Sequence, residues 1–425
     1  MTAVIGVMNK HAIAIAADSA VTVSGTNGSK VYNTANKIFT LSKFHPVSII
    51  IYNNANLMLT PWEIIIKLYR DQLGDKEFPH LRDYSENFFE FLKKKDYFTN
   101  EKAIHNIIYT TLNDLIKNGL HKSMEEVSLS EENLITMEQE KRNKLFSEKF
   151  IEILDLERNN CEHSEALVDF KDFTREEYDK TISPLVDKVY SERYSDFSST
   201  KKSFHDFFYS YILSKQMYGQ WTGLVFAGYG EDEIYPVTIS TKVANVFNER
   251  LRYYTERIEE IDDDNNGSIM PFAQRDVIDT LISGVSPEIN TTLINAFSKV
   301  LTQYNELLIN FIRPISEPLA DKIESLDIDP IFEEFIQHIE EFKRNKHIDP
   351  TVSTVSVLSK EDLTEMAESL IYLTYLKRRI SSDEESVGGP VDVAVISKGD
   401  GFIWIKRKNY FKSEQNPHFL NNYFK

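Results

Sequence analysis

Cysteine, positive charge and long apolar runs are all scarce in this chain of 425 residues. Its single cysteine, Cys161, excludes a disulfide within the chain and agrees with a reducing compartment. The formal net charge is −18, and no Lys/Arg stripe alternates with aromatic residues, so nucleic-acid binding is disfavoured. No run approaches the roughly 20 apolar residues of a membrane span, and no signal-peptide pattern stands at the N-terminus. We therefore expect a cytoplasmic protein with no membrane partner.

Several motifs of common enzyme chemistry are also missing. The sequence has no His-Glu-x-x-His zinc motif, no phosphate-binding loop ending in Gly-Lys-Ser/Thr, and no Gly-x-Ser-x-Gly turn. The acidic stretch from Asp262 matches the first half of a calcium-binding EF-hand loop. Its twelfth position is Ala273, however, where the calcium site requires Glu. The sequence therefore predicts no metal ion and no cofactor.

The most informative residue that is present is the second one. Thr2 follows Met1 and opens an apolar segment, and a residue as small as Thr normally allows the initiator methionine to be removed. A Thr hydroxyl is a weak nucleophile until a base takes its proton, and an α-amine with a pKa of about 8 can do so. An N-terminal Thr2 would carry nucleophile and base together, which makes it a candidate catalytic residue.

The spacing of apolar segments predicts which residues lie beside Thr2. Segments 2–8 and 12–23 read as strands joined by a polar turn, and a hairpin centred on Lys10 pairs residues whose numbers sum to 20. Asp18 would then lie opposite Thr2. Opposed side chains on neighbouring strands are about 5 Å apart, so a carboxylate would stand next to the Thr hydroxyl.

Two further turns extend this row of residues. Asn27-Gly28 predicts a hairpin, because both central positions of a type I′ turn need positive φ, and pairing about it sets Lys37 opposite Asp18. A turn at 43–46 then returns the chain level with Lys37. The predicted row consists of Thr2, Asp18, Lys37 and the backbone amides of Tyr52 and Asn53. The Lys37 ammonium would help the Thr proton to leave. An ordinary cross-strand ion pair of Asp18 and Lys37 is the alternative.

Three segments of this region resemble a known family. They are Thr2-Ala-Val-Ile-Gly-Val, Ala14-Ile-Ala-Ala-Asp-Ser-Ala20 and Asn36-Lys-Ile-Phe39. They look like the opening of proteasome β-type subunits and bacterial proteasome-like peptidases, which are N-terminal nucleophile (Ntn) hydrolases. The spacing from Thr2 to Asp18 agrees with that family without a gap. The resemblance implies that Thr2 is the nucleophile and that Asp18 and Lys37 assist it.

Later segments resemble the same family, with departures. The stretch 223–229 is similar to its middle strand, and 386–404 to its Ser-Gly-Gly loop and last hairpin. The family usually has a Gly pair after its fourth strand, where this chain reads Ile51-Tyr-Asn-Asn-Ala55, although the amide of Tyr52 or Asn53 could still form an oxyanion hole. The family's supporting Asp and Ser align with Glu384 and Val387. A shift of one residue would put Asp383 and Ser386 there instead.

The fold implied by this resemblance is α+β. We expect one Ntn-hydrolase domain with a four-layer α-β-β-α sandwich of two antiparallel sheets. Its core would comprise about 1–120, 216–275 and 359–410, with helical insertions at 121–215 and 276–358. Helix starts are predicted by the capping residues Thr60, Thr174, Ser286 and Ser359. The last of these helices should place Leu363, Met366, Leu370 and Leu373 on its apolar face. Aromatic stripes such as that of 204–211 should be helix packing.

The sequence therefore predicts a threonine-type hydrolase that cleaves peptide bonds. Peptides or unfolded proteins would be its substrates, it would assemble with itself into a ring or spiral, and an ATP-dependent unfoldase is a further candidate partner. One alternative is a catalytically inactive ring subunit of the same fold. Such subunits usually carry an N-terminal extension, which disfavours this alternative, whereas loss of the Gly pair favours it. A small-molecule amidase is another alternative, for which the site would open to bulk solvent.

Overall fold

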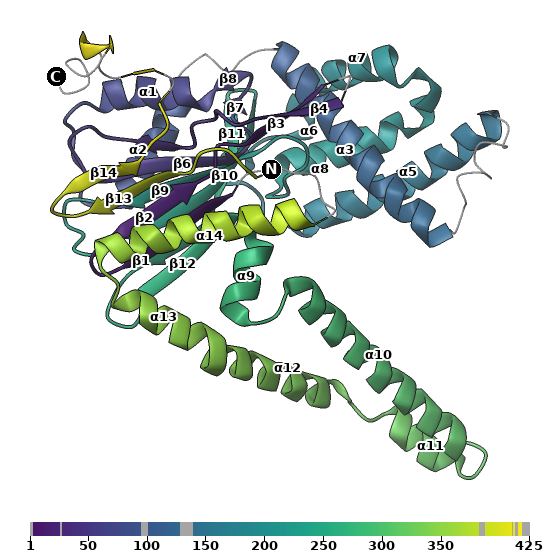
Figure 1. Cartoon of the computed structure of the whole chain (residues 1–425). Helices are drawn as coiled ribbons and strands as arrows, with labels where there is room; N and C mark the ends of the chain where they lie inside the picture. The colour runs from purple at the N-terminus through teal and green to yellow at the C-terminus, as the bar shows by residue number, and fades with distance from the viewer. Residues whose placement is uncertain are drawn as a thin grey trace. The chain divides into compact units, whose positions relative to one another are not determined.

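The computed structural model describes residues 3–25, 28–94, 101–127, 139–381, 387–409, 411–412 and 415–418 (Figure 1). The chain divides into two compact units. We call Met1–Ala35 together with Ile261–Lys425 the terminal unit, and Asn36–Glu260 the central unit. Both units contain antiparallel sheets and helices, so the mixed α and β character expected from the sequence is present. Among the helices described, none has the length and apolar character needed to cross a bilayer.

The terminal unit is built on a five-stranded antiparallel sheet with the order β12-β1-β2-β13-β14. The strands are β1 (Val4–Asn9), β2 (Ile13–Ala17), β12 (Gly267–Ala273), β13 (Asp392–Ser397) and β14 (Gly401–Lys406). Helix α14 (Lys360–Ile380) contacts β1, β2 and β13. Ala14 and Ala16 belong to the core that includes helix α14, while Ile13 and Ile15 point to the opposite face and are also fully buried. Burial on both faces explains why β2 has almost no polar residue.

The first hairpin has a different register from the predicted one. Val4 pairs with Ala17 and Met8 with Ile13, so paired numbers sum to 21 rather than 20. The reason is that the turn is held by the Asn9 amide, which donates to the Ala12 carbonyl at 3.1 Å, and a turn of this length centres after Lys10. The prediction that Asp18 lies opposite Thr2 is therefore wrong by one residue, and Ala3 takes that place.

The second hairpin also exists with a shifted register. Strands β3 (Val21–Gly25) and β4 (Gly28–Tyr32) pair so that Val21 faces Tyr32 and Gly25 faces Gly28. Paired numbers sum to 53 instead of the predicted 55, because the turn is centred one residue earlier than Asn27-Gly28; its two central residues lie outside the described ones. The predicted register of this hairpin is therefore wrong, and the ladder, which ends at Tyr32, does not reach Lys37.

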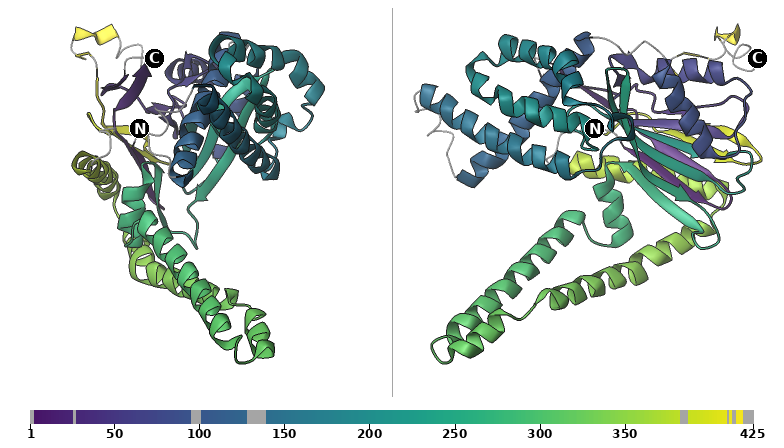
Figure 2. Two further views of the ribbon diagram at one scale, coloured as in Figure 1. Left: turned by 90° about the vertical axis from the view of Figure 1, so that its right-hand side faces the viewer. Right: turned by 180° about the vertical axis from the view of Figure 1, so that it is seen from behind.

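The rest of the terminal unit is a helical arm, defined as residues 287–343. It consists of α10 (Pro287–Ile312), α11 (Glu317–Glu324) and α12 (Asp329–Lys343). The arm is joined to the sheet by α9 (Arg275–Ser283) on one side, and by a π-helical turn (Arg344–Ile348) and α13 (Asp349–Ser356) on the other. The arm extends away from the terminal sheet (Figures 1 and 2). Its inner contact is a stack of the Phe297 and Phe335 rings, whose centroids are 4.0 Å apart.

The central unit contains a second five-stranded antiparallel sheet, with the order β11-β10-β9-β6-β5. The strands are β5 (Ile38–Thr40), β6 (Val47–Asn53), β9 (Thr222–Gly228), β10 (Val237–Phe247) and β11 (Arg250–Glu260). In the β5–β6 pair, Ile38 faces Ile50, which brings Lys37 level with Ile51. The prediction that Tyr52 and Asn53 are level with Lys37 therefore misses by one and two residues. The turn at 43–46 lies between these strands, as predicted.

Helices and short strands complete the central unit. They are β7 (Asn56–Leu57), β8 (Thr60–Pro61), α1 (Trp62–Leu73), α2 (Leu81–Lys93), α3 (Glu101–Val127), α5 (Gln139–His163), α6 (Arg175–Thr181), α7 (Ser183–Arg193) and α8 (Lys201–Leu213), with 3-10 turns at Val168–Phe170 and Ser195–Thr200. Aromatic rings dominate the core. Phe204, Phe207, Phe208 and Tyr211 of α8 are all fully buried, which confirms that this stripe is helix packing.

The predicted helix starts are mostly confirmed. The side chains of Thr174, Ser286 and Ser359 each accept a hydrogen bond from the backbone amide three residues later, at 3.1 to 3.2 Å. Thr60 is the exception, because it pairs with Leu57 in β7–β8 and the helix begins at Trp62. In α14, Leu363 and Leu370 are buried as predicted, whereas Leu373 is 37% exposed.

Candidate active site

The best-defined part of the candidate site is the carboxylate of Asp18, which follows β2 and is 1% exposed. Its Oδ1 accepts a hydrogen bond from the Ala3 amide at 2.8 Å. Its Oδ2 accepts from the Ala20 and Gly388 amides, both at 3.1 Å. A buried carboxylate is costly unless its oxygens are hydrogen-bonded, and three amide donors meet that need. Asp18 thus joins three segments that are distant in the sequence.

This junction fixes the chain next to two predicted catalytic residues. Asp18 also donates its own amide to the Ala3 carbonyl at 3.1 Å, so Ala3 is held from both sides. Ala3 follows Thr2, and Gly388 stands two residues after Ser386. Thr2 and Ser386 themselves lie outside the described residues. The sequence identified Asp18 as important, but it assigned the carboxylate to Lys37 and missed the amide donors of Ala3, Ala20 and Gly388.

The Gly388-Gly389 loop is shaped by its second glycine. Gly389 has φ +78°, and a Cβ added there would lie 2.7 Å from the Asn33 Cβ. A side chain at this position would therefore be strained and would clash. At Gly388 the nearest atom to an added Cβ would be 3.6 Å away, an ordinary contact. Val387 is the residue that the gap-free alignment puts at the position of the supporting Ser. It is 1% exposed and packs in the apolar core of the terminal unit.

The other predicted site residues, Lys37, Tyr52 and Asn53, belong to the central unit. Lys37 directly precedes β5 and is 5% exposed. Its carbonyl accepts a hydrogen bond from the Ile51 amide at 2.8 Å, which ties it to β6. A buried ammonium must be compensated by polar or charged partners. The backbone of Lys37 is therefore fixed at the start of the β5–β6 pair, and its role as an assisting residue stays a prediction.

Strand alternation separates the two candidate oxyanion amides. In an antiparallel strand, successive backbone amides point to opposite neighbours. Because the Ile51 amide points to Lys37, the amide of Tyr52 faces β9, where Tyr52 pairs with Gly223. The amide of Asn53 then points back to the side of Lys37. Asn53 is the better candidate for the oxyanion donor.

Asn53 also marks the end of β6. Its φ is +70°, a conformation that Asn tolerates better than most residues. Its side-chain amide donates to the Trp221 carbonyl at 2.9 Å. The backbone at Asn53 is therefore fixed by a contact to the residue that precedes β9. Asn is one of the few residues other than glycine that adopt this conformation readily.

The Tyr52 side chain lies flat across the sheet. A Cβ added to Gly223 would come within 1.9 Å of the Tyr52 Cζ, so Gly223 provides the space for this ring. Burial raises the pKa of the Tyr52 hydroxyl, and a hydrogen bond with Ser240 on β10 opposes this effect. The Trp221 ring meets the Tyr52 ring edge-on, with centroids 5.9 Å apart. Tyr52 is thus a packed residue whose hydroxyl points along the sheet.

A charged pair that the sequence analysis missed lies beside Tyr52. The Lys242 Nζ is 2.6 Å from a Glu256 carboxylate oxygen and 5.2 Å from the Trp221 ring centroid. Burial lowers the pKa of Lys242, but its hydrogen bond and charge interaction with Glu256 outweigh burial and raise it. The signal in the sequence is weak, since Lys242 is a single charged residue within an otherwise uncharged strand.

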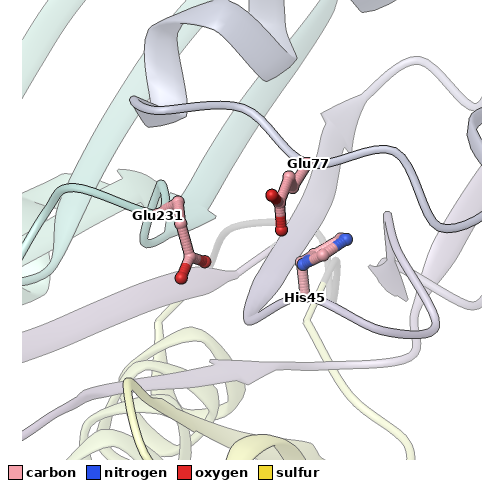
Figure 3. A group of neighbouring side chains, drawn as sticks. All are labelled: His45, Glu77 and Glu231. Carbon is pink, nitrogen blue, oxygen red and sulfur yellow. The ribbon is translucent and has the colours of Figure 1, made fainter.

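One cluster among the described residues could hold a metal ion. His45, Glu77 and Glu231 come from three loops of the central unit, and their ligand atoms lie within 4.8 Å of one another (Figure 3). The His45 Nε2 lies 3.0 Å from the Asp75 carbonyl, which leaves Nδ1 to act as a ligand. Both glutamates are exposed, and exposed carboxylates commonly gather on surfaces without an ion. We therefore assign no function to this candidate metal site.

Comparisons with known proteins add no relative. No protein-family model matches the chain, and no curated protein is similar enough in sequence to count as a match.

Proposed function

We propose that the protein is a threonine-type Ntn hydrolase that cleaves peptide bonds with Thr2 after removal of Met1. The observation that carries this proposal is the Asp18 carboxylate, which binds the amides of Ala3 and Gly388 and so ties the chain beside Thr2 to the Gly-Gly loop. The proposed four-layer sandwich would be made from the two five-stranded antiparallel sheets and their helices. Helix α14 packs on the sheet of the terminal unit, and α1 and α2 belong to the core on the sheet of the central unit.

In the proposed reaction, Thr2 Oγ attacks the carbonyl carbon of the scissile amide. The Thr2 α-amine takes the hydroxyl proton, directly or through a water molecule, and returns it to the leaving amine. The C–N bond then breaks and leaves an ester on Thr2. Water activated by the same amine hydrolyses this ester and restores the enzyme. The Asn53 amide would hold the oxyanion of both tetrahedral intermediates.

The other residues have supporting roles in this proposal. Lys37 would place a positive charge near Thr2 Oγ and thereby favour loss of its proton. Asp18 is a positioning residue, because its oxygens are engaged by backbone amides. Ser386 would support the α-amine. Peptides and unfolded proteins are the proposed substrates, with self-assembly into a ring or spiral and an ATP-dependent unfoldase as proposed partners.

A catalytically inactive subunit of the same fold is the second candidate function. The observation that favours it is the replacement of the family's Gly pair at Tyr52 and Asn53, where a side chain adjoins the proposed oxyanion position. The two candidates differ in one measurable property. Only the hydrolase requires a reactive hydroxyl at an N-terminal Thr2.

Mass spectrometry after treatment with a threonine-directed β-lactone or epoxyketone tests the proposal. We expect an N-terminal peptide that lacks Met1 and carries the inhibitor on Thr2, and we expect Lys37→Ala to abolish labelling. Thr2→Ala provides the matched control for labelling elsewhere. Retention of Met1 together with no adduct at high inhibitor concentration would overturn the hydrolase and favour the inactive subunit.

A second variant tests the positioning role of Asp18. Asp18→Asn removes the charge and puts an NH2 group where one oxygen accepts amide hydrogen bonds, so we expect at least tenfold slower labelling of Thr2 and about 2–3 kcal/mol lower stability. Asp263→Asn is the control, because Asp263 is a highly exposed carboxylate paired with Lys10 and should leave both quantities unchanged. Equal labelling rates in Asp18→Asn and the unmodified protein would contradict the role.

A further inference from the structure

Helix α10 carries an apolar stripe that the chain leaves uncovered. No residue of this 26-residue helix is buried. Six large apolar side chains along it are 55% to 72% exposed: Ile289, Leu293, Val300, Tyr304, Leu307 and Phe311. At 100° per residue these six positions fall within an arc of about 60°, so they form one continuous line along the helix. A stripe this regular is typical of a helix that packs against another helix.

The stripe is distinct from the contact that holds the arm together. The inner contact uses Phe297, whose ring stacks on Phe335 of α12 and lies 6.3 Å from that of Phe332. Phe297, Leu301 and Leu308 are half-buried and occupy the adjacent side of α10. Folding of the arm therefore explains the half-buried residues but leaves the exposed line without a structural role.

The area of the stripe matches that of a specific protein interface. Each exposed side chain contributes on the order of 100 Å², so the six side chains and Ile315, which is 74% exposed and follows the end of α10, amount to roughly 700 Å². The largest apolar patch on a typical monomer is about 300–600 Å². A standard interface buries about 800 Å² on each partner. The stripe is thus large enough to form a stable pair by itself.

We propose that α10 is a self-association surface on which α10 of a second copy of this chain packs antiparallel. The order of the apolar residues supports this occupant, because it is nearly palindromic about Thr302. Val300 and Tyr304 are equally distant from Thr302, as are Leu293 and Phe311, while Ile289 has its counterpart in Ile315 just after the end of α10. In a two-fold interface residue i meets j while j meets i, so each of these large side chains would meet another large side chain.

The charges beside the stripe favour the same orientation. Lys299 and Glu306 are both exposed and flank one side of the stripe, three and four residues from Thr302. Antiparallel pairing brings Lys299 level with Glu306 of the partner subunit, and the two-fold axis repeats this contact. Parallel pairing in register would instead put these two residues of one subunit and those of the other on opposite sides of the interface, so that Lys299 and Glu306 could not meet across it. Such rim charges set orientation more than affinity.

This inference does not rest on the proposed hydrolase activity. The arm lies within 276–358, a region whose sequence resembles no part of the Ntn-hydrolase family, and it contains no residue of the candidate active site. Association through α10 and labelling of Thr2 can therefore fail separately. A different protein that supplies an apolar helix is the competing occupant. Sedimentation of the full chain alone distinguishes it from a second copy of this chain.

Sedimentation of the full chain at several concentrations tests the proposal. We expect a dimer contact that the double substitution Val300→Glu with Leu307→Glu weakens at least 100-fold, because it buries two charges at the centre of the stripe. Ile331→Glu on α12 is the matched control; this residue is 53% exposed on the same arm and should leave association unchanged. A chain that stays monomeric at 100 times the concentration of an ordinary assay (on the order of 100 μM) would overturn the proposal.

Two further sets of variants test the orientation. Lys299→Glu and Glu306→Lys should each weaken association, and the combined charge exchange should restore it. Antiparallel pairing brings position 300 of one subunit opposite position 304 of the other, so a mixture of Val300→Cys and Tyr304→Cys proteins should form the mixed disulfide under oxidation. The native Cys161 is buried and should not take part. Disulfides within each variant alone, without the mixed one, would contradict antiparallel pairing. Association that survives Val300→Glu with Leu307→Glu, or a stripe that binds only a foreign helix, would also overturn it.

Discussion

Two helical regions of this chain treat their apolar side chains in opposite ways. In the central unit, α8 buries Phe204, Phe207 and Phe208 completely. In the terminal unit, α10 carries a longer apolar stripe but contains no buried residue. Both segments read alike in the sequence, as helices with apolar residues on one side. The comparison teaches that an amphipathic pattern shows which side chains need cover, but not whether the same chain provides it.

The neighbours of each helix explain the difference. Helix α8 packs against α5 and α7, and its Phe208 ring meets Phe247 of β10 edge-on at 5.8 Å between centroids. Helix α10 instead contacts α9, α11 and α12 within an arm that extends from the sheet of the terminal unit (Figure 2). A helix in an arm has fewer neighbours than a helix in a core. Its remaining apolar side is exposed, and it is the surface on which we propose that a second copy of the chain packs.

The largest expected effect contrasts one phenylalanine from each helix. Phe207→Ala should lower the free energy of unfolding by about 3–5 kcal/mol, because it removes a fully buried ring and leaves a cavity. Phe311→Ala, at a side chain that is 72% exposed, should change monomer stability by no more than about 0.5 kcal/mol. Urea unfolding at low protein concentration measures both. A cost at Phe311 equal to that at Phe207 would remove the distinction between the two helices.

Local signals in the sequence predicted local structure well. Thr174, Ser286 and Ser359 cap their helices as expected, because an N-cap hydrogen bond depends on residues within one turn. The turns after β1, β3 and β5 are also where the polar residues indicated. Register was less predictable. One residue more or less in a turn shifts every pair after it, and the composition of the turn at Lys10 does not determine that length.

Contacts between distant segments could not be predicted from the sequence. Asp18 was identified from spacing and resemblance, but its bond to the Gly388 amide joins residues 370 positions apart. Strand alternation shows which of the Tyr52 and Asn53 amides points to the side of Lys37, but only when the strand register is known. For the same reason the exposure of α10 was not foreseen, because its stripe resembles that of a buried helix until the neighbours are placed.

A smaller effect follows from buried tyrosines, which are numerous in the central unit. Burial raises the pKa of Tyr194 to about 12, and its hydroxyl donates to the Asn113 side chain at 2.7 Å. An unfolded Tyr ionises near pH 10, so between about pH 10 and 12 the unfolded chain loses this proton first. Because the folded pKa is raised, the stabilising contribution is present below pH 10 and is lost as pH rises towards 12.

Alkaline unfolding experiments test this contribution. Tyr194→Phe removes the ionisable group. We expect the unfolding free energy to fall less steeply between pH 10 and 12, with the number of protons released on unfolding reduced by up to one. Tyr304→Phe on the exposed stripe of α10 is the matched control and should leave the slope unchanged. If the two variants alter the slope equally, burial does not control proton release in the way the comparison requires.

The smallest effect compares two helix caps of the same kind. Ser286→Ala and Thr174→Ala each remove one N-cap hydrogen bond of 3.2 Å, and such a loss costs about 1 kcal/mol. The same local cost should appear differently in the two regions. Thr174 caps α6, which contains the buried Tyr178, so its loss should lower global stability. Ser286 caps α10, which has no buried residue, so its loss should speed hydrogen exchange at the start of α10 while global unfolding stays the same. Faster exchange along the whole chain in Ser286→Ala would mean that the arm and the sheet unfold together, and that the two helices are less different than their burial indicates.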